Sequence, residues 1–176
     1  MTWTEAGVFC ALGLAALDGI LLAVLARTEE NPSDTEHGLP LGTAFPAFEA
    51  LALDGSSVTE THAFGKLVLF LGTQCQPCHQ LARELEGAEP QERAWLLTIV
   101  ADRGEDPPGA DLLSELAFLP ASRVIRDRAR FLTERLAMPG LPFAYGVDRR
   151  GSIRAKRAVR SLETLRGAAR ATGLRA

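Results

Sequence analysis

Two cysteines separated by two residues, Cys75 and Cys78, are the part of this sequence best suited to chemistry. They follow an apolar run, 67–71, and precede an amphipathic stretch, 81–86, that is typical of a helix. The first helical turn carries unpaired N–H groups and the positive end of the helix dipole, which favour Cys75 as a thiolate. Pro77 suits this turn, where its missing N–H costs little. Because thiolates attack disulfides, the spacing predicts a redox dithiol in which Cys75 attacks and Cys78 resolves.

The same residues, together with His79, also match the Cys-x-x-Cys-His pattern of covalent haem attachment. The flanks favour the dithiol, since haem attachment needs no strand that runs into the first cysteine. Met138 could supply an axial sulfur, so a haem or copper carrier that uses both cysteines and His79 stays an alternative. Two cysteines alone make a poor zinc site, which usually has four ligands. We therefore expect no metal and no cofactor.

Length and composition limit the remaining possibilities. The chain has 176 residues and a net charge of -3, which allows one domain of roughly 135 residues and an N-terminal appendage. It contains no repeat and no basic tract, so we do not expect nucleic acid as a partner. The third cysteine, Cys10, lies in a hydrophobic segment, so the pair is not part of a structural disulfide framework.

Residues 1–26 are predicted to form an N-terminal transmembrane helix, with the span at about 7–26. The first six residues lack Lys and Arg, which argues against a cleaved signal peptide. Asp18 is costly within such a span. The positive-inside rule, applied to Arg27, weakly favours a cytoplasmic C-terminal domain. We nonetheless expect a single-pass membrane protein with the domain outside the cytoplasm, because disulfides persist there.

The residues after the span are predicted to form two further parts. Residues 27–40 are acidic and turn-rich, as in a flexible linker. Residues 41–176 alternate strand and helix patterns, which predicts an α/β domain with a mixed sheet flanked by helices. Strands are expected at 45–53, 58, 67–71, 95–101, 123–125, 142–145 and 152–159, and helices at 80–87, 111–118, 129–138 and from Ser161 onward.

Three segments of this domain resemble the thioredoxin-like superfamily, particularly the membrane-anchored thiol-disulfide proteins of the TlpA, ResA and MauD type. The segments are Leu41 to Phe48 with Leu53-Asp54-Gly55, Leu69 to Cys78, and Gly140-Leu141-Pro142-Phe143 followed by the Asp148/Gly151 turn, and the resemblance covers roughly residues 41–170. The Leu-Pro-aromatic signature and the anchor before Arg27 look most like MauD. That family implies maturation of disulfides in methylamine dehydrogenase, and its relatives imply maturation of cytochrome c type proteins.

The resemblance also implies a substrate site at Leu141 and Pro142. Pro142 matches a proline that approaches the dithiol in cis, which would expose the Leu141 backbone for strand-like pairing with a substrate. The sequence departs from the pattern in two places. Gln74 stands where many relatives have an aromatic residue, and Leu69 stands where cytosolic thioredoxins carry a buried acid. Proton transfer from Cys78 then needs another group or water.

The remaining neighbours of the dithiol are Gln74, Gln76, Pro77 and His79. His79 lies four residues after Cys75, close to one helical turn, and as a cation it would further favour the thiolate. It could equally be a solvated helix residue, and we favour that interpretation.

Taken together, the residues and the resemblance predict a membrane-tethered, extracytoplasmic thiol-disulfide oxidoreductase. Its expected partners are protein disulfides or thiols and a redox partner in the membrane. The direction of exchange depends on a redox potential that the sequence does not give. A peroxiredoxin-like thiol peroxidase is the alternative enzyme, because Pro46, Phe48 and Asp54-Gly55 also occur in such chains. The spacing from Thr73 to Cys75 departs from the peroxidatic loop.

Overall fold

The computed structural model describes residues 38–102, 112–128 and 130–174. The expected membrane anchor, most of the expected linker and the polar loop at 103–111 lie outside these residues. Within the described ranges, no helix is long and apolar enough to cross a membrane.

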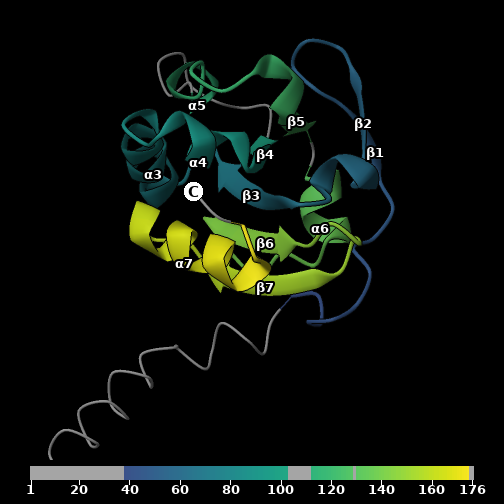
Figure 1. The fold of residues 1–176 in the computed structure, drawn as a ribbon. Coiled ribbons are helices and arrows are strands. Elements are labelled where there is room, and N and C mark those ends of the chain that lie inside the picture. Colours follow the sequence, from purple (N-terminus) through teal and green to yellow (C-terminus); the bar gives the residue numbers. More distant parts are fainter. Residues whose placement is uncertain (1–37, 103–111, 129, 175–176) are drawn as a thin grey trace, which may run out of the picture. The chain divides into compact units, whose positions relative to one another are not determined.

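Five strands form a mixed sheet in the order β5-β4-β3-β6-β7 (Figure 1). β3, β4 and β5 are parallel, whereas β6 runs antiparallel to β3, and β7 antiparallel to β6. A two-stranded ladder of β1 and β2 is joined to β5 by a bridge between Ala52 and Ile125. The strands are β1 (Glu49–Leu51), β2 (Ser57–Thr59), β3 (Lys66–Gly72), β4 (Leu96–Asp102), β5 (Val124–Arg128), β6 (Phe143–Val147) and β7 (Ile153–Ala158).

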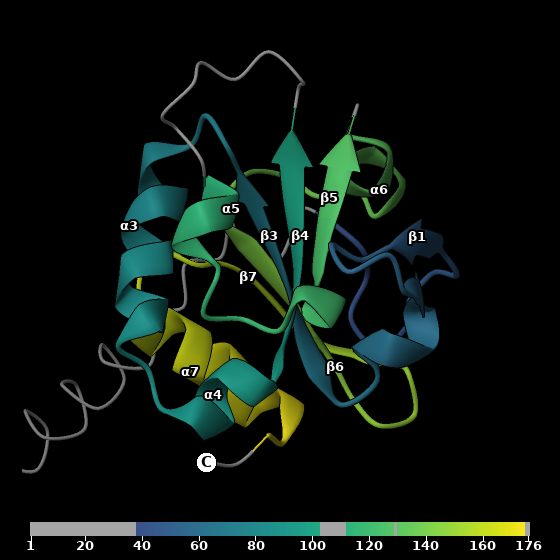
Figure 2. The ribbon, with the colours of Figure 1, turned by 90° about the horizontal axis from the view of Figure 1, so that it is seen from above.

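Helices cover both faces of this sheet (Figure 2). One face packs against α3, α5 and α7, and the other against α6, η1 and the segment that begins at Leu39. The helices are η1 (Glu60–Ala63), α3 (Gln76–Glu86), α4 (Pro90–Ala94), α5 (Leu112–Glu115), η2 (Ala121–Arg123), α6 (Phe131–Arg135) and α7 (Leu162–Thr172).

The alternation of side chains along β3 explains why both faces are covered. Leu67, Leu69 and Leu71 are fully buried against the α3 and α7 face, whereas Val68 and Phe70 are fully buried against the opposite face. Successive side chains of a strand point to opposite faces, so an apolar run without interruption requires cover on both. β3 is therefore the central strand, and the two cysteines follow its C-terminal end.

The structure confirms the thioredoxin-like α/β architecture expected from the sequence, but several element bounds were wrong. The helix expected at 129–138 is only Phe131–Arg135, because Arg130 and Ala137 adopt left-handed backbone angles, with φ of 61° and 48°, that interrupt a helix on either side. The strand expected at 45–53 is reduced to β1. A helix that we did not expect, α4, begins at Pro90, where a capping box between Glu89 and Glu92 satisfies its first amides.

Candidate active site

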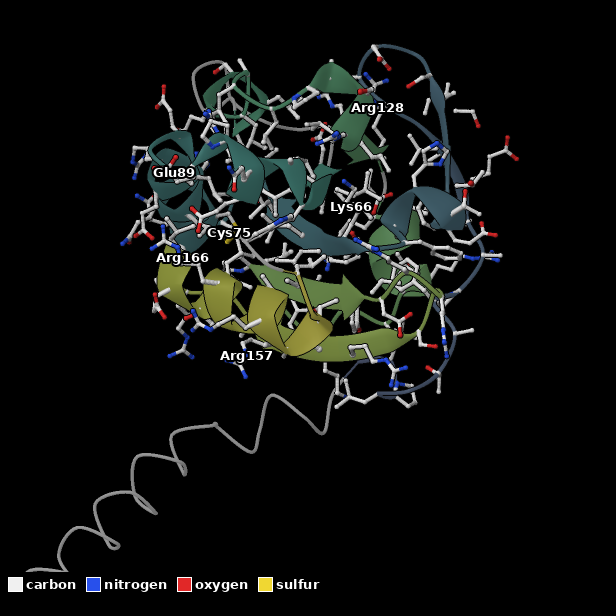
Figure 3. All side chains as sticks on the ribbon, viewed as in Figure 1. Lys66, Cys75, Glu89, Arg128, Arg157 and Arg166 are labelled. Carbon is white, nitrogen blue, oxygen red and sulfur yellow. A yellow bond between two sulfur atoms is a disulfide. The ribbon has the colours of Figure 1, made fainter. Side chains whose placement is uncertain are left out.

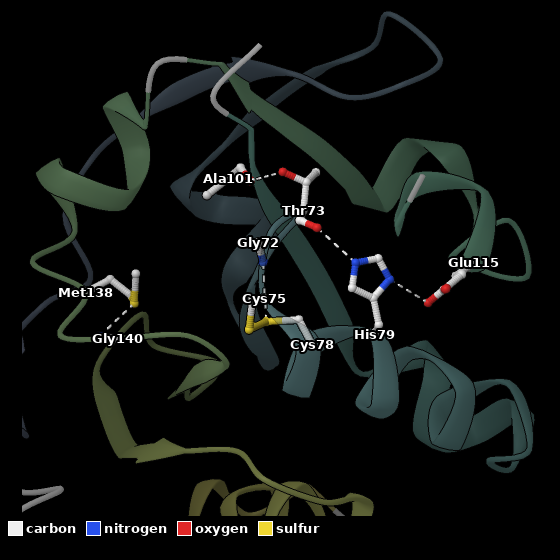
Figure 4. Close-up of a disulfide and its surroundings, with 9 residues drawn as sticks. All are labelled: Gly72, Thr73, Cys75, Cys78, His79, Ala101, Glu115, Met138 and Gly140. Carbon is white, nitrogen blue, oxygen red and sulfur yellow. Dashed lines mark hydrogen bonds and ion pairs between the residues drawn. A yellow bond between two sulfur atoms is a disulfide. The ribbon is translucent and has the colours of Figure 1, made fainter. Parts of the chain in front are cut away.

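Cys75 and Cys78 form a disulfide at the junction of β3 and α3 (Figure 4), with 5.2 Å between their Cα atoms. Cys75 is the N-cap of α3, and its carbonyl accepts hydrogen bonds from the amides of Cys78 and His79. Pro77 lies in the first helical turn. The local sequence thus places the first sulfur at the positive end of an 11-residue helix, where a thiolate is stabilised.

The two sulfurs differ in their access to solvent. Cys75 is partly exposed, whereas Cys78 is fully buried in the core cluster that contains Leu69 and Leu81. The amide of Gly72 donates to Sγ of Cys78 at 3.4 Å. A substrate sulfur can therefore approach Cys75, while Cys78 is placed to react only with Cys75.

The Leu141–Pro142 peptide bond is cis, as the resemblance implied. Pro142 is buried immediately before β6, and its carbonyl accepts a hydrogen bond from the amide of Val159. The side chain of Leu141 packs so closely on β3 that a Cβ at Gly72 would lie 2.6 Å from its Cδ1 atom. The absence of a side chain at Gly72 thus allows Leu141 to lie beside Cys75.

A cavity of about 300 Å³ opens beside Cys75. Gln74 lines it, as does the side chain of Leu141, whereas Gln76 and Pro77 are exposed on the first turn of α3 without lining it. The described lining residues are Gly72, Thr73, Gln74, Cys75, Ala101, Arg130, Met138, Pro139, Gly140 and Leu141. They come from four separate parts of the chain, 72–75, 101, 130 and 138–141, and Cys75 brings the disulfide to this cavity.

His79 is not the solvated helix residue that we favoured from the sequence. Its side chain is only 13% exposed, and Nε2 lies 2.9 Å from the carbonyl oxygen of Thr73. Nδ1 lies 3.1 Å from Oε2 of Glu115 on α5, which also pairs with Arg83 (Figure 4). A carbonyl oxygen can only accept, so Nε2 carries a hydrogen and His79 fastens the loop before Cys75 to α3.

Two residues of this site were not recognised as neighbours of the dithiol in the sequence. Arg130 precedes α6, and Met138 entered only as a possible haem ligand. Sδ of Met138 accepts from the amide of Gly140, and both residues lie on the opposite side of the disulfide from His79 (Figure 4). No local sequence pattern identifies Arg130 or Met138 as a site residue. They lie before and after α6, and only the tertiary fold brings them close to Cys75.

The alternatives to a dithiol gain no support from this geometry. Both cysteine sulfurs are joined to each other and the ring nitrogens of His79 face Thr73 and Glu115, so these side chains offer no free ligand in this state. Across the described ranges, no three His, Cys, Asp or Glu side chains cluster as metal ligands. The hydroxyl of Thr73 is directed at the carbonyl of Ala101 rather than held for a peroxide at Cys75.

No protein-family model matches this chain, and no curated protein sequence matches it. Solved structures do. The thio-disulfide isomerase of Thermus thermophilus is similar over 78% of this chain and all of its own, with a TM-score of 0.57 and 22% identity. A thiol:disulfide interchange protein from a Bacteroides species is similar over 75% of this chain and 90% of its own, with a TM-score of 0.55 and 18% identity. These similarities show the thioredoxin-like fold.

Proposed function

We propose that this protein is a thiol-disulfide oxidoreductase that acts on protein substrates. The observation that carries the proposal is the asymmetry of the disulfide, in which Cys75 is partly exposed at a helix start beside a cavity and Cys78 is fully buried. The printed names of the similar structures, a thio-disulfide isomerase and a thiol:disulfide interchange protein, support the same chemistry.

The reaction follows from this asymmetry. In the reduced protein, the Cys75 thiolate attacks one sulfur of a substrate disulfide, forms a mixed disulfide and releases the other substrate sulfur as a thiolate. Cys78 then passes its proton to the released substrate thiolate and attacks Sγ of Cys75, which releases the second substrate thiolate. The substrate gains two electrons, and the dithiol becomes the disulfide present in the structure.

The direct test is reduction of insulin by dithiothreitol, catalysed by the full 176-residue chain in a nonionic detergent. We expect catalysis by the wild type and accumulation of mixed disulfides on Cys75 in the Cys78→Ser variant, because the resolving sulfur is missing. If Cys78→Ser turned over normally and Cys75→Ser trapped substrate instead, the two roles would be reversed. The redox potential of the pair then decides between a reductant, an oxidant and an isomerase.

We further propose that residues 7–26 anchor the protein in a membrane with the folded domain outside the cytoplasm. The support is the apolar sequence of that segment and the persistence of disulfides in such compartments. There the dithiol would exchange with a redox partner in the membrane and mature disulfides of the methylamine dehydrogenase or cytochrome c type. A phosphatase fused after Ala176 should be active outside the cytoplasm. Activity of only a cytoplasmic reporter would reject this topology.

A further inference from the structure

Arg130 lines the cavity beside Cys75, although 55 residues separate the two in sequence (130 minus 75). It immediately precedes α6 and lines the same cavity as Leu141 and Met138. The exchange reaction described above assigns no role to it. A cation in this position would act on whatever group occupies the cavity during exchange.

The guanidinium of Arg130 is incompletely satisfied. Its Nε atom is buried and has no hydrogen-bond partner, and no carboxylate among the described residues pairs with it. Arginine stays charged at all relevant pH values, and an unpaired, partly desolvated cationic N–H is costly. An anionic group that entered the cavity would pair with the positive charge of this guanidinium and offset part of that cost.

In the part of the chain that the structure describes, the acidic side chains at the ends of β4 and β5 have other partners. The carboxylate of Asp127 accepts from the amides of Leu132 and Thr133, at 3.0 and 2.8 Å, and from the Thr133 hydroxyl at 2.7 Å. Asp102, at the end of β4, pairs with Arg126. Asp127 thus fixes the turn that holds Arg130 at its left-handed φ of 61°, an uncommon conformation for a residue other than glycine. The turn therefore presents Arg130 to the cavity without neutralising it.

We propose that Arg130 binds a carboxylate of the substrate, so that the protein selects disulfides whose cysteine is flanked by an acidic residue. The proposal rests on the proposed function and names its substrate class. The cavity of about 300 Å³ has room for such a side chain. Met138, Pro139 and Leu141 offer apolar surface for its methylene groups, and Arg130 binds its charged end.

Alkylation of the reduced full-length chain tests the anion site independently of the exchange activity. Iodoacetate and iodoacetamide attack the same thiolate but differ in charge. The rate ratio of iodoacetate to iodoacetamide should fall about three- to fivefold in Arg130→Gln, the size expected for one partly exposed ion pair. Arg130→Lys should restore most of the ratio, and Arg130→Asn, whose side chain tolerates left-handed backbone, should match Arg130→Gln.

Arg128→Gln is the matched control, because it removes an exposed arginine of β5 that does not line the cavity. It should leave the ratio unchanged. Equal slowing of both reagents in Arg130→Gln would overturn the proposal, since it would show that Arg130 acts on the sulfur rather than on a bound anion.

A pair of disulfide-linked peptides that differ only by Glu or Gln beside the cysteine tests the substrate class. The wild type should reduce the Glu peptide several-fold faster, and Arg130→Gln should abolish this preference while Arg128→Gln keeps it. Glutathione disulfide carries carboxylates beside its cysteine but no extended protein segment. A preference that depends on Arg130 but is confined to glutathione would therefore overturn the assignment to a protein segment. Failure to reduce any disulfide would reject the proposed function, whereas the alkylation ratio would still decide the anion site.

Discussion

The two ends of the central sheet differ in whether their polar groups have hydrogen-bond partners. Where β3 and β4 end, Cys75 is partly exposed, Nε of Arg130 has no partner and a cavity opens between them. Where β3 and β4 begin, Nζ of Lys66 and the guanidinium of Arg123 both donate to the carbonyl of Ala94, at 2.7 and 3.0 Å. We call the first the sulfur end and the second the paired end.

The paired end also carries the bidentate ion pair that joins two helices. Arg166 of α7 donates to both carboxylate oxygens of Glu92 in α4, at 2.6 and 3.0 Å. Figure 3 shows Arg166 and Glu89 on the same side of the molecule. These hydrogen bonds hold the pKa of Glu92 below its ordinary value, and burial lowers the pKa of Lys66. The comparison indicates that one end stabilises the fold and the other leaves groups available to a substrate.

The largest effect is expected at the sulfur end, where a substitution of Cys75 should remove activity without a change in stability. Cys75→Ser should reduce insulin reduction to the uncatalysed rate, because the other cysteine among the described residues, Cys78, is fully buried and does not line the cavity. Its free energy of unfolding should stay within about 0.5 kcal/mol of the reduced wild type, as for most substitutions outside the core. Reduced protein is the proper reference, since it removes the contribution of the disulfide. Residual catalysis above background would assign the attack to another group.

The paired end should show the reverse behaviour. Glu92→Gln should lower the free energy of unfolding by about 1.5–3 kcal/mol, the range for a hydrogen bond to a charged group, and leave the exchange rate unchanged. Urea unfolding monitored by circular dichroism measures the first, and insulin reduction the second. Glu163→Gln, which breaks an exposed pair with Arg170, is the control and should have a much smaller effect on stability. A change in exchange rate with Glu92→Gln would show that the ends are coupled.

The stability difference between wild type and Glu92→Gln should depend on pH. Because the pKa of Glu92 is lowered in the folded protein, its contribution is fully present above the ordinary glutamate pKa of about 4.3. It is lost as the pH falls from there through the lowered pKa of the folded state. Unfolding curves between pH 7 and pH 3 check this, and a difference that grew toward acid pH would contradict the assigned cause.

A smaller effect is expected from His79 at the sulfur end. His79→Gln should slow insulin reduction about three- to tenfold, which corresponds to the loss of roughly one hydrogen-bonded contact. The reason is that the loop before Cys75 loses its attachment through Thr73 and Glu115. His62→Gln removes an exposed histidine of η1 and should leave the rate unchanged. Wild-type activity in His79→Gln would mean that this contact does not position the loop.

The smallest effect is expected between the two ends, at Tyr145. Its hydroxyl accepts from the amide of Leu39 and donates to the carbonyl of Leu136. Tyr145→Phe should lower the free energy of unfolding by about 0.5–1.5 kcal/mol and leave exchange unaffected, because the ring contacts with Phe70 and Phe143 remain. Hydrogen exchange should accelerate at the amide of Leu39. Unchanged protection there would show that the hydroxyl does not hold this segment.

The dithiol and the central strand covered on both faces could be predicted from the sequence, because both depend on local patterns. Two cysteines at a helix start and an apolar run of leucine, valine and phenylalanine side chains can be recognised without knowledge of distant residues. The cis bond at Pro142 was expected only from the family resemblance, since X-Pro bonds are mostly trans.

His79 and Arg130 show why the rest of the site was not predictable. The burial of His79 depends on Glu115, which α5 brings across from 36 residues away (115 minus 79). The helical pattern at 129–138 gave no indication of the two left-handed residues, Arg130 and Ala137, that limit the length of α6. A single backbone angle produces no periodic signal in a sequence. Arg130 therefore fell within a predicted helix and was not identified as a site residue, although tertiary packing places it at the cavity beside Cys75.

The hydrogen bond from the amide of Gly72 to Sγ of Cys78 makes that amide an internal spectroscopic reporter. Its proton chemical shift depends on whether the acceptor is a disulfide sulfur, a thiol or a thiolate. A single cross-peak in a nitrogen–proton correlation spectrum would then follow the oxidation state of the buried sulfur. No label would be needed on either cysteine. The ratio of oxidised to reduced cysteine pair could thus be measured at this one glycine, in a titration with redox buffers or inside living cells.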